Sequence, residues 1–315
     1  MRSRCPITYA VLGPDEAGPY SAAGLKQLDR NLRRLENLPL AAEELRQEAV
    51  RRAAKMSIQG LQPKLSAVLR VTQGTFEIVD AGGRWILKPQ SQTFLELPEN
   101  EDLTMRLAAA AGVEVPIHGL VRSKDGSWTY VVERFDRRTR GRKLAVEDFA
   151  QLSGRTRDTK YDSSMEKVAT VVEEFTTFPR VQLIRLFRLT LFSFLVGNED
   201  MHLKNFSLIT RPQGQIEMSP AYDLLNSTIA LENAREEMAL PIRGRKRNLS
   251  RRDLVSYFGS ERLGLNNTLL EETLLDLDAA GPEWDAQIDA SFLSDGAKDA
   301  YRDVVAERRA RLFGP

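Results

Sequence analysis

The segment from Asp200 to Asn205 places an aspartate, a histidine, a lysine and an asparagine close together in the sequence. It follows an apolar stretch, residues 181–196, after three intervening residues, and polar groups beside an apolar core are costly unless they are paired or used. A second carboxylate, Asp223, follows further along the chain. Carboxylates can accept protons, and carboxylate and amide oxygens can hold magnesium. These residues predict a metal-dependent phosphoryl-transfer site.

Asp200 and Asn205 have the spacing of the catalytic loop of protein kinases, H-R-D-L-x-x-x-N. In that loop the aspartate accepts the substrate proton and the asparagine holds magnesium. Lys88 ends an apolar stretch, and Glu99 and Glu101 follow at the start of a predicted helix. A strand lysine followed by a helix glutamate is the order of the kinase ion pair that positions the lysine on ATP. The sequence leaves open which of the two glutamates pairs with Lys88.

Simpler interpretations of these residues are also open. The turn from Asp200 to Asn205 could only cap the buried helix, and Lys88 could be a surface residue. A metallohydrolase would need ligands beyond His202, and the only other histidine is His118. With a single cysteine as well, we expect no structural zinc cluster. The Walker pattern, any G-x-G and the G-x-S-x-G turn of Ser-His-Asp hydrolases are all absent.

The composition is that of an ordinary globular protein, with 42% hydrophobic and 28% charged residues in 315. A net charge of +1 argues against binding nucleic acid through bulk charge. The single Cys5 excludes an intramolecular disulfide and suits the cytoplasm, and we see no signal peptide. The stretch 181–196 contains Arg185 and Arg188 and is short for a membrane span, so we expect a buried helix.

The order of elements favours an α+β fold, with an N-terminal lobe over residues 1–135 and a mostly helical C-terminal lobe over 136–315. Early helices are expected over 22–35 and 41–55, and the polar stretch 154–164 is expected to be a mobile loop. The strands expected in the first lobe are 65–69, 76–79, 84–89, 115–121 and 129–135, with one helix over 98–111 inserted between them. The later helices are expected over 148–152, 164–175, 181–196 and from about 251 to the C-terminus.

Several segments, taken in order, resemble the HipA family of bacterial serine/threonine kinase toxins. They are residues 57–65, 85–88, 98–101, 132–136, 147–149, 198–207 and 220–223. HipA carries an extra small N-terminal subdomain that this sequence is expected to lack. The stretch 20–26 resembles the start of the shorter HipT-like branch, in which a separate small HipS-like protein replaces that subdomain.

The resemblance implies a two-lobed, protein-kinase-like fold with an antiparallel sheet and a helix in the N-terminal lobe. Residues 1–56 would be a variable segment, and residues 57–135 would form the sheet that covers the nucleotide. Asp200 would be the catalytic base, and Asn205 and Asp223 would hold Mg²⁺.

The resemblance also implies ATP as a cofactor. Lys88 would contact its phosphates, with Glu101 or Glu99 beside the lysine, and Ser57 would be a site of autophosphorylation. HipT-like proteins commonly carry a second serine where this sequence has Gln59, so two-site regulation is not expected. The other nucleotide-binding residues would be Gln59, Gly60, Leu61, Gln62, Pro63 and Lys64 over the phosphates, His202, Leu203 and Lys204 lining them, and Glu133, Arg134 and Phe135 at the adenine.

The family implies a toxin of a type II toxin–antitoxin system that phosphorylates an aminoacyl-tRNA synthetase, tryptophanyl rather than glutamyl, and so inhibits translation. A HipB-like DNA-binding antitoxin would be its partner, with DNA contacted only through it. The alternative is a catalytically silent nucleotide-binding subunit of a repressor complex. The basic run from Arg243 to Arg252 is either a solvated loop or a contact for tRNA or operator DNA.

Overall fold

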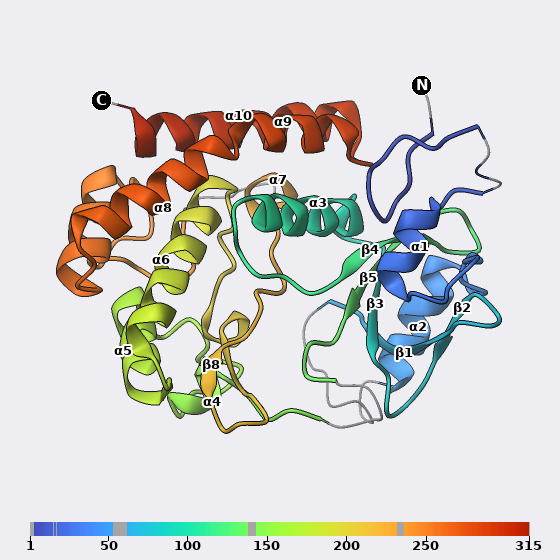
Figure 1. Cartoon of the computed structure of the whole chain (residues 1–315), viewed down its shortest axis with the longest axis horizontal. Coiled ribbons are helices and arrows are strands. Elements are labelled where there is room, and N and C mark those ends of the chain that lie inside the picture. Colours follow the sequence, from blue (N-terminus) through green and yellow to red (C-terminus); the bar gives the residue numbers. More distant parts are fainter. Residues whose placement is uncertain are drawn as a thin grey trace. The chain divides into compact units, whose positions relative to one another are not determined.

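The computed structural model describes residues 3–14, 16, 18–52, 62–137, 143–231 and 236–314. The chain forms two compact units (Figure 1). The first unit contains Met1–Leu103, Pro116–Arg137 and Asp289–Ser294, and the second contains Thr104–Val115, Arg138–Ile288 and Asp295–Pro315. The main part of the first unit thus ends near residue 135, where the sequence predicts the division, but the first unit also takes in Asp289–Ser294 and the second takes in Thr104–Val115.

The first unit is built on an antiparallel sheet with the strand order β2-β1-β3-β5-β4. Its strands match those expected from the sequence, because each combines β-branched or aromatic residues with a flanking turn. Helix α3 (Leu97–Ala110) follows β3 and continues from Thr104 into the second unit, where Gly112, with a φ of 72°, lies just beyond its end. The strands are β1 (Leu65–Arg70), β2 (Thr75–Ile78), β3 (Trp85–Pro89), β4 (His118–Arg122) and β5 (Trp128–Glu133).

Helices α1 (Ala22–Leu28) and α2 (Ala42–Arg52) belong to the same unit. The expectation of a helix over 22–35 was wrong, because α1 ends at Leu28. Asp29 adopts an extended conformation there, and its side chain accepts a hydrogen bond from the backbone N–H of Asn31 at 2.9 Å. Leu32 and Leu35 are buried in the core all the same, so their helix-like spacing reflects burial of a non-helical segment.

The second unit also contains a three-stranded antiparallel sheet with the order β6-β7-β8. The expectation of a mostly helical lobe missed this sheet, since strands of three or four residues are too short to show a period-2 pattern. Its strands are β6 (Val146–Asp148), β7 (Ser207–Thr210) and β8 (Ile216–Met218). Its described helices are α4 (Phe149–Leu152), α5 (Met165–Phe175), α6 (Pro179–Leu195), the short 3-10 helix η3 (Leu203–Asn205), α7 (Ser227–Ala230), the π-helix η4 (Arg252–Arg262), α8 (Asn267–Ala279), α9 (Gly281–Ala290, whose last residues fall in the first unit) and α10 (Asp295–Phe313).

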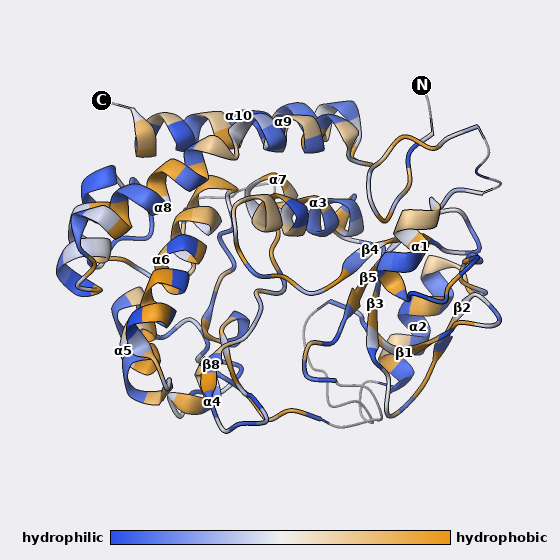
Figure 2. Cartoon of the chain, viewed as in Figure 1, coloured by the Kyte–Doolittle hydropathy of each residue, from blue (hydrophilic) through white to orange (hydrophobic). Residues whose placement is uncertain are grey.

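Helix α6 is the buried helix expected from the sequence, and it lies beside α5 (Figure 1). Figure 2 shows both hydrophobic and hydrophilic positions along it. Arg188 donates a hydrogen bond to the carbonyl of Ala111 at 3.0 Å and pairs with Asp276, so this charge is satisfied within the unit. Gly197, with a φ of 69°, ends the helical segment and turns the chain toward Asp200. Among the described helices, none is long and apolar enough to cross a membrane.

Candidate functional site

The chain between α6 and β7, residues 197–206, forms a compact turn that we call the Asp200 turn. The backbone N–H of His202 donates to the carbonyl of Asp200 at 2.8 Å, and the N–H of Asn205 donates to the carbonyl of His202 at 2.9 Å. The side-chain Nδ2 of Asn205 donates to the same carbonyl of Asp200 at 3.0 Å. This bond fixes the orientation of the Asn205 amide, and no described group donates to its Oδ1, so this oxygen can act as an acceptor or metal ligand.

The carboxylate of Asp200 is exposed and is held from one side. The hydroxyl of Tyr161, from the loop after α4, donates to Asp200 Oδ1 at 2.5 Å. Burial raises the pKa of Tyr161, and the hydrogen bond to Asp200 raises it further, so the hydroxyl stays protonated as a donor. No group in the described ranges donates to Oδ2 of Asp200, which leaves this oxygen accessible to an incoming proton donor.

His202 is buried beside this carboxylate and contacts the same loop. Lys160 Nζ lies 2.6 Å from His202 Nε2, and the rings of Tyr161 and His202 meet edge to face with centroids 5.1 Å apart. Burial lowers the pKa of His202, which favours the neutral ring. If Nε2 accepts from the ammonium group, the ring proton is on Nδ1, and Nδ1 is buried with no acceptor among the described residues.

Asp223 directly follows Tyr222, which is hydrogen-bonded to the Asp200 turn. The hydroxyl of Tyr222 donates to the carbonyl of Lys204 at 2.8 Å and lies 2.5 Å from the hydroxyl of Ser207. Asp223 itself has a φ of 53°, a left-handed conformation that is uncommon for this residue type. Its charge reaches the turn, because Asp223 is among the groups that raise the pKa values of Lys160 and His202 against the larger lowering by burial.

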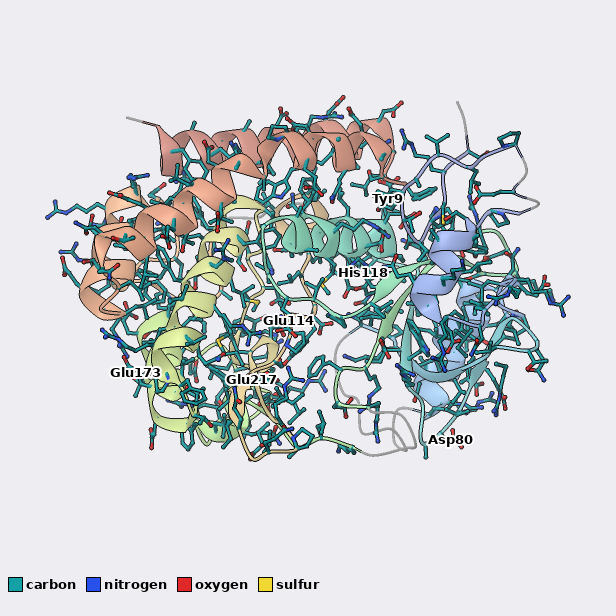
Figure 3. All side chains as sticks on the ribbon, viewed as in Figure 1. Tyr9, Asp80, Glu114, His118, Glu173 and Glu217 are labelled. Atoms are coloured by element: carbon teal, nitrogen blue, oxygen red, sulfur yellow. The ribbon has the colours of Figure 1, made fainter. Side chains whose placement is uncertain are left out.

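A pair of arginines supports the segment that leads to Asp223. Arg185 donates to the carbonyl of Met218 at 3.0 Å and to the carboxylate of Glu114 at 2.7 Å. Arg211 pairs with Glu217 at 2.5 Å, and both glutamates are labelled in Figure 3. These contacts fix the end of β8, from which the chain continues to Asp223.

Lys204 and Leu203 have structural roles in the Asp200 turn. Lys204 Nζ lies 2.6 Å from Asp148 Oδ2, and the other oxygen of Asp148 accepts from the backbone of Gln151 as the N-cap of α4. Leu203 is fully buried in the apolar core. The charge of Lys204 is therefore already balanced by a carboxylate.

In the first unit, Lys88 Nζ lies 2.6 Å from Glu101 Oε1, and both side chains are only 4% exposed. Of the two glutamates between which the sequence could not decide, Glu101 is therefore the one that pairs with Lys88. Glu99 is also buried, but its Oε2 has no hydrogen-bond partner in the described chain, and burial raises its pKa to about 7. On the same helix, Asp102 lies 2.8 Å from Nδ1 of His118, the residue labelled in Figure 3.

The other predicted nucleotide-binding residues of this unit have varied surroundings. Glu133 forms an ion pair with Arg84, and Arg134 donates two hydrogen bonds of 2.9 Å to Asp136. Gln62 Nε2 is buried without an acceptor among the described residues. Pro63, Lys64 and Phe135 are described as well, whereas Ser57, Gln59, Gly60 and Leu61 lie outside the described residues.

The structure brings Asp200, His202 and Asn205 together on one turn in the second unit, with Asp223 acting electrostatically on it, and Lys88 and Glu101 together in the first. Sequence reasoning missed Lys160 and Tyr161, which come from the loop expected to be mobile. The only available signal was an aromatic residue within that polar stretch.

Comparison with known proteins identifies the family. The family model for the HipA-like C-terminal domain matches residues 56–284. This chain belongs to the HipA-like C-terminal domain family. A Haemophilus influenzae protein named "Putative kinase" is 29% identical over 301 residues, covering 86% of this chain and 86% of that protein. The serine/threonine-protein kinase toxin HipA of Shewanella oneidensis is 28% identical over 208 residues, which cover 60% of this chain and 47% of that toxin.

The fold agrees with this membership in the HipA-like family. A solved structure of Shewanella oneidensis HipA with HipB and its operator DNA aligns with a TM-score of 0.69 and 22% identity. The alignment covers 97% of this chain and 75% of that one. The α+β HipA-like fold expected from the sequence is therefore confirmed, while the assignment to the HipT-like branch stays a prediction.

Proposed function

We propose that this HipA-family protein is a serine/threonine protein kinase that uses ATP and magnesium. The observation that carries the proposal is the geometry of the Asp200 turn. One oxygen of the Asp200 carboxylate is held by Tyr161, the other is open, and Asn205 is braced against the backbone of the same aspartate. A fixed carboxylate with one free oxygen is suited to take the proton of an acceptor hydroxyl.

The oxygen donors of the second unit fit a magnesium ion. Asn205 offers Oδ1 from an amide that is held in place through Nδ2, and Asp223 offers a carboxylate from a strained backbone position. Magnesium is typically held by one or two such side chains together with substrate phosphates. When bound, the ion would neutralise charge on the phosphates, while Asp200 holds the acceptor proton.

Buried donors without acceptors support a phosphate ligand. Gln62 Nε2 in the first unit and His202 Nδ1 in the second are both buried and without partners in the described chain. Such groups are rare in folded proteins and call for an explanation, and phosphate oxygens would supply the missing acceptors. In the first unit, Lys88, steadied by Glu101, would contact the phosphates as well.

We assign the adenine contact to the segment from Glu133 to Phe135, with one refinement. The side chains of Glu133 and Arg134 are held by Arg84 and Asp136. Backbone groups and the Phe135 ring are therefore the parts of this segment that we expect adenine to meet. The loop residues Gln59, Gly60, Leu61, Pro63 and Lys64 would cover the phosphates, as the family resemblance implies.

We further propose a toxin role, in which the kinase phosphorylates an aminoacyl-tRNA synthetase, tryptophanyl in preference to glutamyl, and so inhibits translation. The relative named as a kinase toxin and the solved complex of its HipA with HipB support a HipB-like antitoxin as partner. A HipS-like small protein is a second proposed partner. Autophosphorylation of Ser57 would add about −1.5 to −2 charges beside the triphosphate and disfavour ATP.

The test is phosphate transfer into a cell lysate, with the acceptor identified by mass spectrometry. Replacing Asp200 with Asn should slow transfer by about 10²–10⁴-fold while leaving ATP binding unchanged, because the base is lost and the fold is not. Asp285→Asn, at an exposed position on α9, is the matched control and should transfer at the normal rate. Normal transfer by Asp200→Asn would refute the assignment of the base. ATP binding without transfer by the unaltered chain would favour the silent subunit.

A further inference from the structure

The loop between α4 and α5 reaches the Asp200 turn through backbone and side chains. The N–H of Leu203 donates to the carbonyl of Lys160 at 3.3 Å, and Lys160 Nζ lies 2.6 Å from His202 Nε2. The neighbouring Tyr161 binds the carboxylate of Asp200. Lys160 is therefore fixed at the turn by three separate contacts around it.

The two lysines at this turn differ in how their charge is balanced. Lys204 has the carboxylate of Asp148 at 2.6 Å. Lys160 has no carboxylate within ion-pair distance among the described residues, and its hydrogen-bond partner is the uncharged ring of His202. Its ammonium also lies 4.8 Å from the centre of the Tyr161 ring. An ammonium group has three donors, so at least one of them is available to a ligand.

Burial and two nearby carboxylates affect the pKa of Lys160. Burial is the largest influence and lowers the pKa of Lys160, whereas Asp200 and Asp223 raise it from beyond hydrogen-bond distance. Lys160 is thus a half-buried cation near the two carboxylates to which the proposed function assigns proton acceptance and magnesium. A cation held in such a place without an ion-pair partner is suited to an anion that arrives there.

We propose that Lys160 binds the phosphoryl group that is transferred, as a cation in addition to magnesium. The proposal rests on the proposed function, because it takes Asp200 as the base beside which transfer occurs. Charge accumulates on the oxygens of the transferred group, and a fixed ammonium beside the base would stabilise it. The ring of His202 would hold the ammonium in position, with its own Nδ1–H also available to a phosphate oxygen.

The test compares the binding of two magnesium nucleotides by calorimetry, ADP and a non-hydrolysable ATP analogue. Only the latter carries the third phosphate. Lys160→Met keeps the apolar stem and removes the charge, so it should weaken binding of the ATP analogue by about tenfold or more, as expected for a lost charged hydrogen bond. Binding of ADP should change far less. Lys160→Arg should restore most of the preference for the analogue.

The matched control is Lys167→Met, at an exposed position on α5 of the same unit, and it should leave both affinities unchanged. Circular dichroism and thermal melting check that each variant is folded. Equal weakening of both nucleotides, or none, in folded Lys160→Met would overturn the role of Lys160. If the unaltered chain bound neither nucleotide, the proposed function itself would fail, so the two failures are distinguishable.

Discussion

Lys88 in the first unit and Lys160 in the second both lie near acidic side chains, but only the charge of Lys88 is balanced by a carboxylate at ion-pair distance among the described residues. Lys88 has a carboxylate of Glu101 at 2.6 Å and is almost fully buried. Lys160 is partly exposed and contacts a neutral ring, while its nearest carboxylates stay beyond ion-pair distance among the described residues. The first arrangement stabilises a fixed position for the lysine, and the second leaves a charge available.

The same contrast applies to the carboxylates. Glu101 is enclosed with its partner, whereas Asp200 is exposed and has one oxygen without a donor in the described chain. Removing one partner of a buried ion pair strongly destabilises the folded state, whereas an exposed carboxylate can be replaced with little effect on stability. We therefore expect substitutions in the first unit to act mainly on stability and those at the Asp200 turn to act mainly on transfer.

The largest effect on stability should come from Lys88→Met. It removes the cation that lies 2.6 Å from the buried carboxylate of Glu101, which should lower the free energy of unfolding by about 3–5 kcal/mol. The double variant Lys88→Met/Glu101→Met removes both charges and should recover most of that loss. Urea unfolding, followed by tryptophan fluorescence, measures both.

The exposed ion pair of Arg70 and Glu77 lies in the same sheet and provides the control. Glu77→Gln should leave the urea midpoint nearly unchanged, because exposed pairs contribute little. If the double variant were as unstable as Lys88→Met, the uncompensated charge could not be the cause of the loss.

The pair of Lys88 and Glu101 also shows what the sequence could and could not supply. The order of strand, lysine and helix glutamate was sufficient to predict an ion pair. The choice between Glu99 and Glu101 was not, since residues two apart on a helix point about 200° away from each other. Only the packing of α3 against the sheet decides which carboxylate meets Lys88.

Glu99 gives the next prediction, which concerns pH. Burial raises its pKa from an ordinary 4.5 to about 7, so the folded state keeps the proton over a range in which the unfolded state loses it. The associated stability is present below about pH 4.5 and is lost as the pH rises toward 7. The free energy of unfolding should therefore fall by about 3 kcal/mol across this window.

Glu99→Gln should remove this fall, because the amide does not titrate. Urea unfolding at a series of pH values measures it, with Glu43→Gln, at an exposed position on α2, as the control that should retain it. An unchanged pH dependence in Glu99→Gln would mean that another group holds the proton.

The residues at the Asp200 turn likewise fall into two groups, those that the sequence could predict and those that it could not. The spacing of Asp200 and Asn205 predicted a turn with catalytic chemistry, because those residues are local and their roles follow from their types. Lys160 and Tyr161 lie some forty residues earlier in a polar loop with no periodic pattern. No local preference indicates where such a loop docks, so its contribution appears only in the folded chain.

The smallest effect that we predict is that of Tyr161→Phe on phosphate transfer. Its hydroxyl donates to Asp200 Oδ1 and directs the other oxygen outward, so we expect it to orient the base. Tyr161→Phe should reduce kcat for phosphate transfer by about three- to tenfold, the size of one hydrogen bond, and should leave KM for ATP unchanged. Steady-state kinetics on the phosphorylated acceptor separates the two constants.

Tyr257→Phe is the matched control, because burial and Glu166, a carboxylate in the same unit, also raise the pKa of the Tyr257 hydroxyl. It should leave kcat unchanged. A faster Tyr161→Phe variant would reverse the interpretation, since the hydroxyl would then compete with the acceptor for Asp200. A rise in KM for ATP with unchanged kcat would instead connect Tyr161 to the nucleotide. The accessible Asp200 turn predicts the fall in kcat instead, because Tyr161 occupies one oxygen of Asp200 and leaves the other for the acceptor.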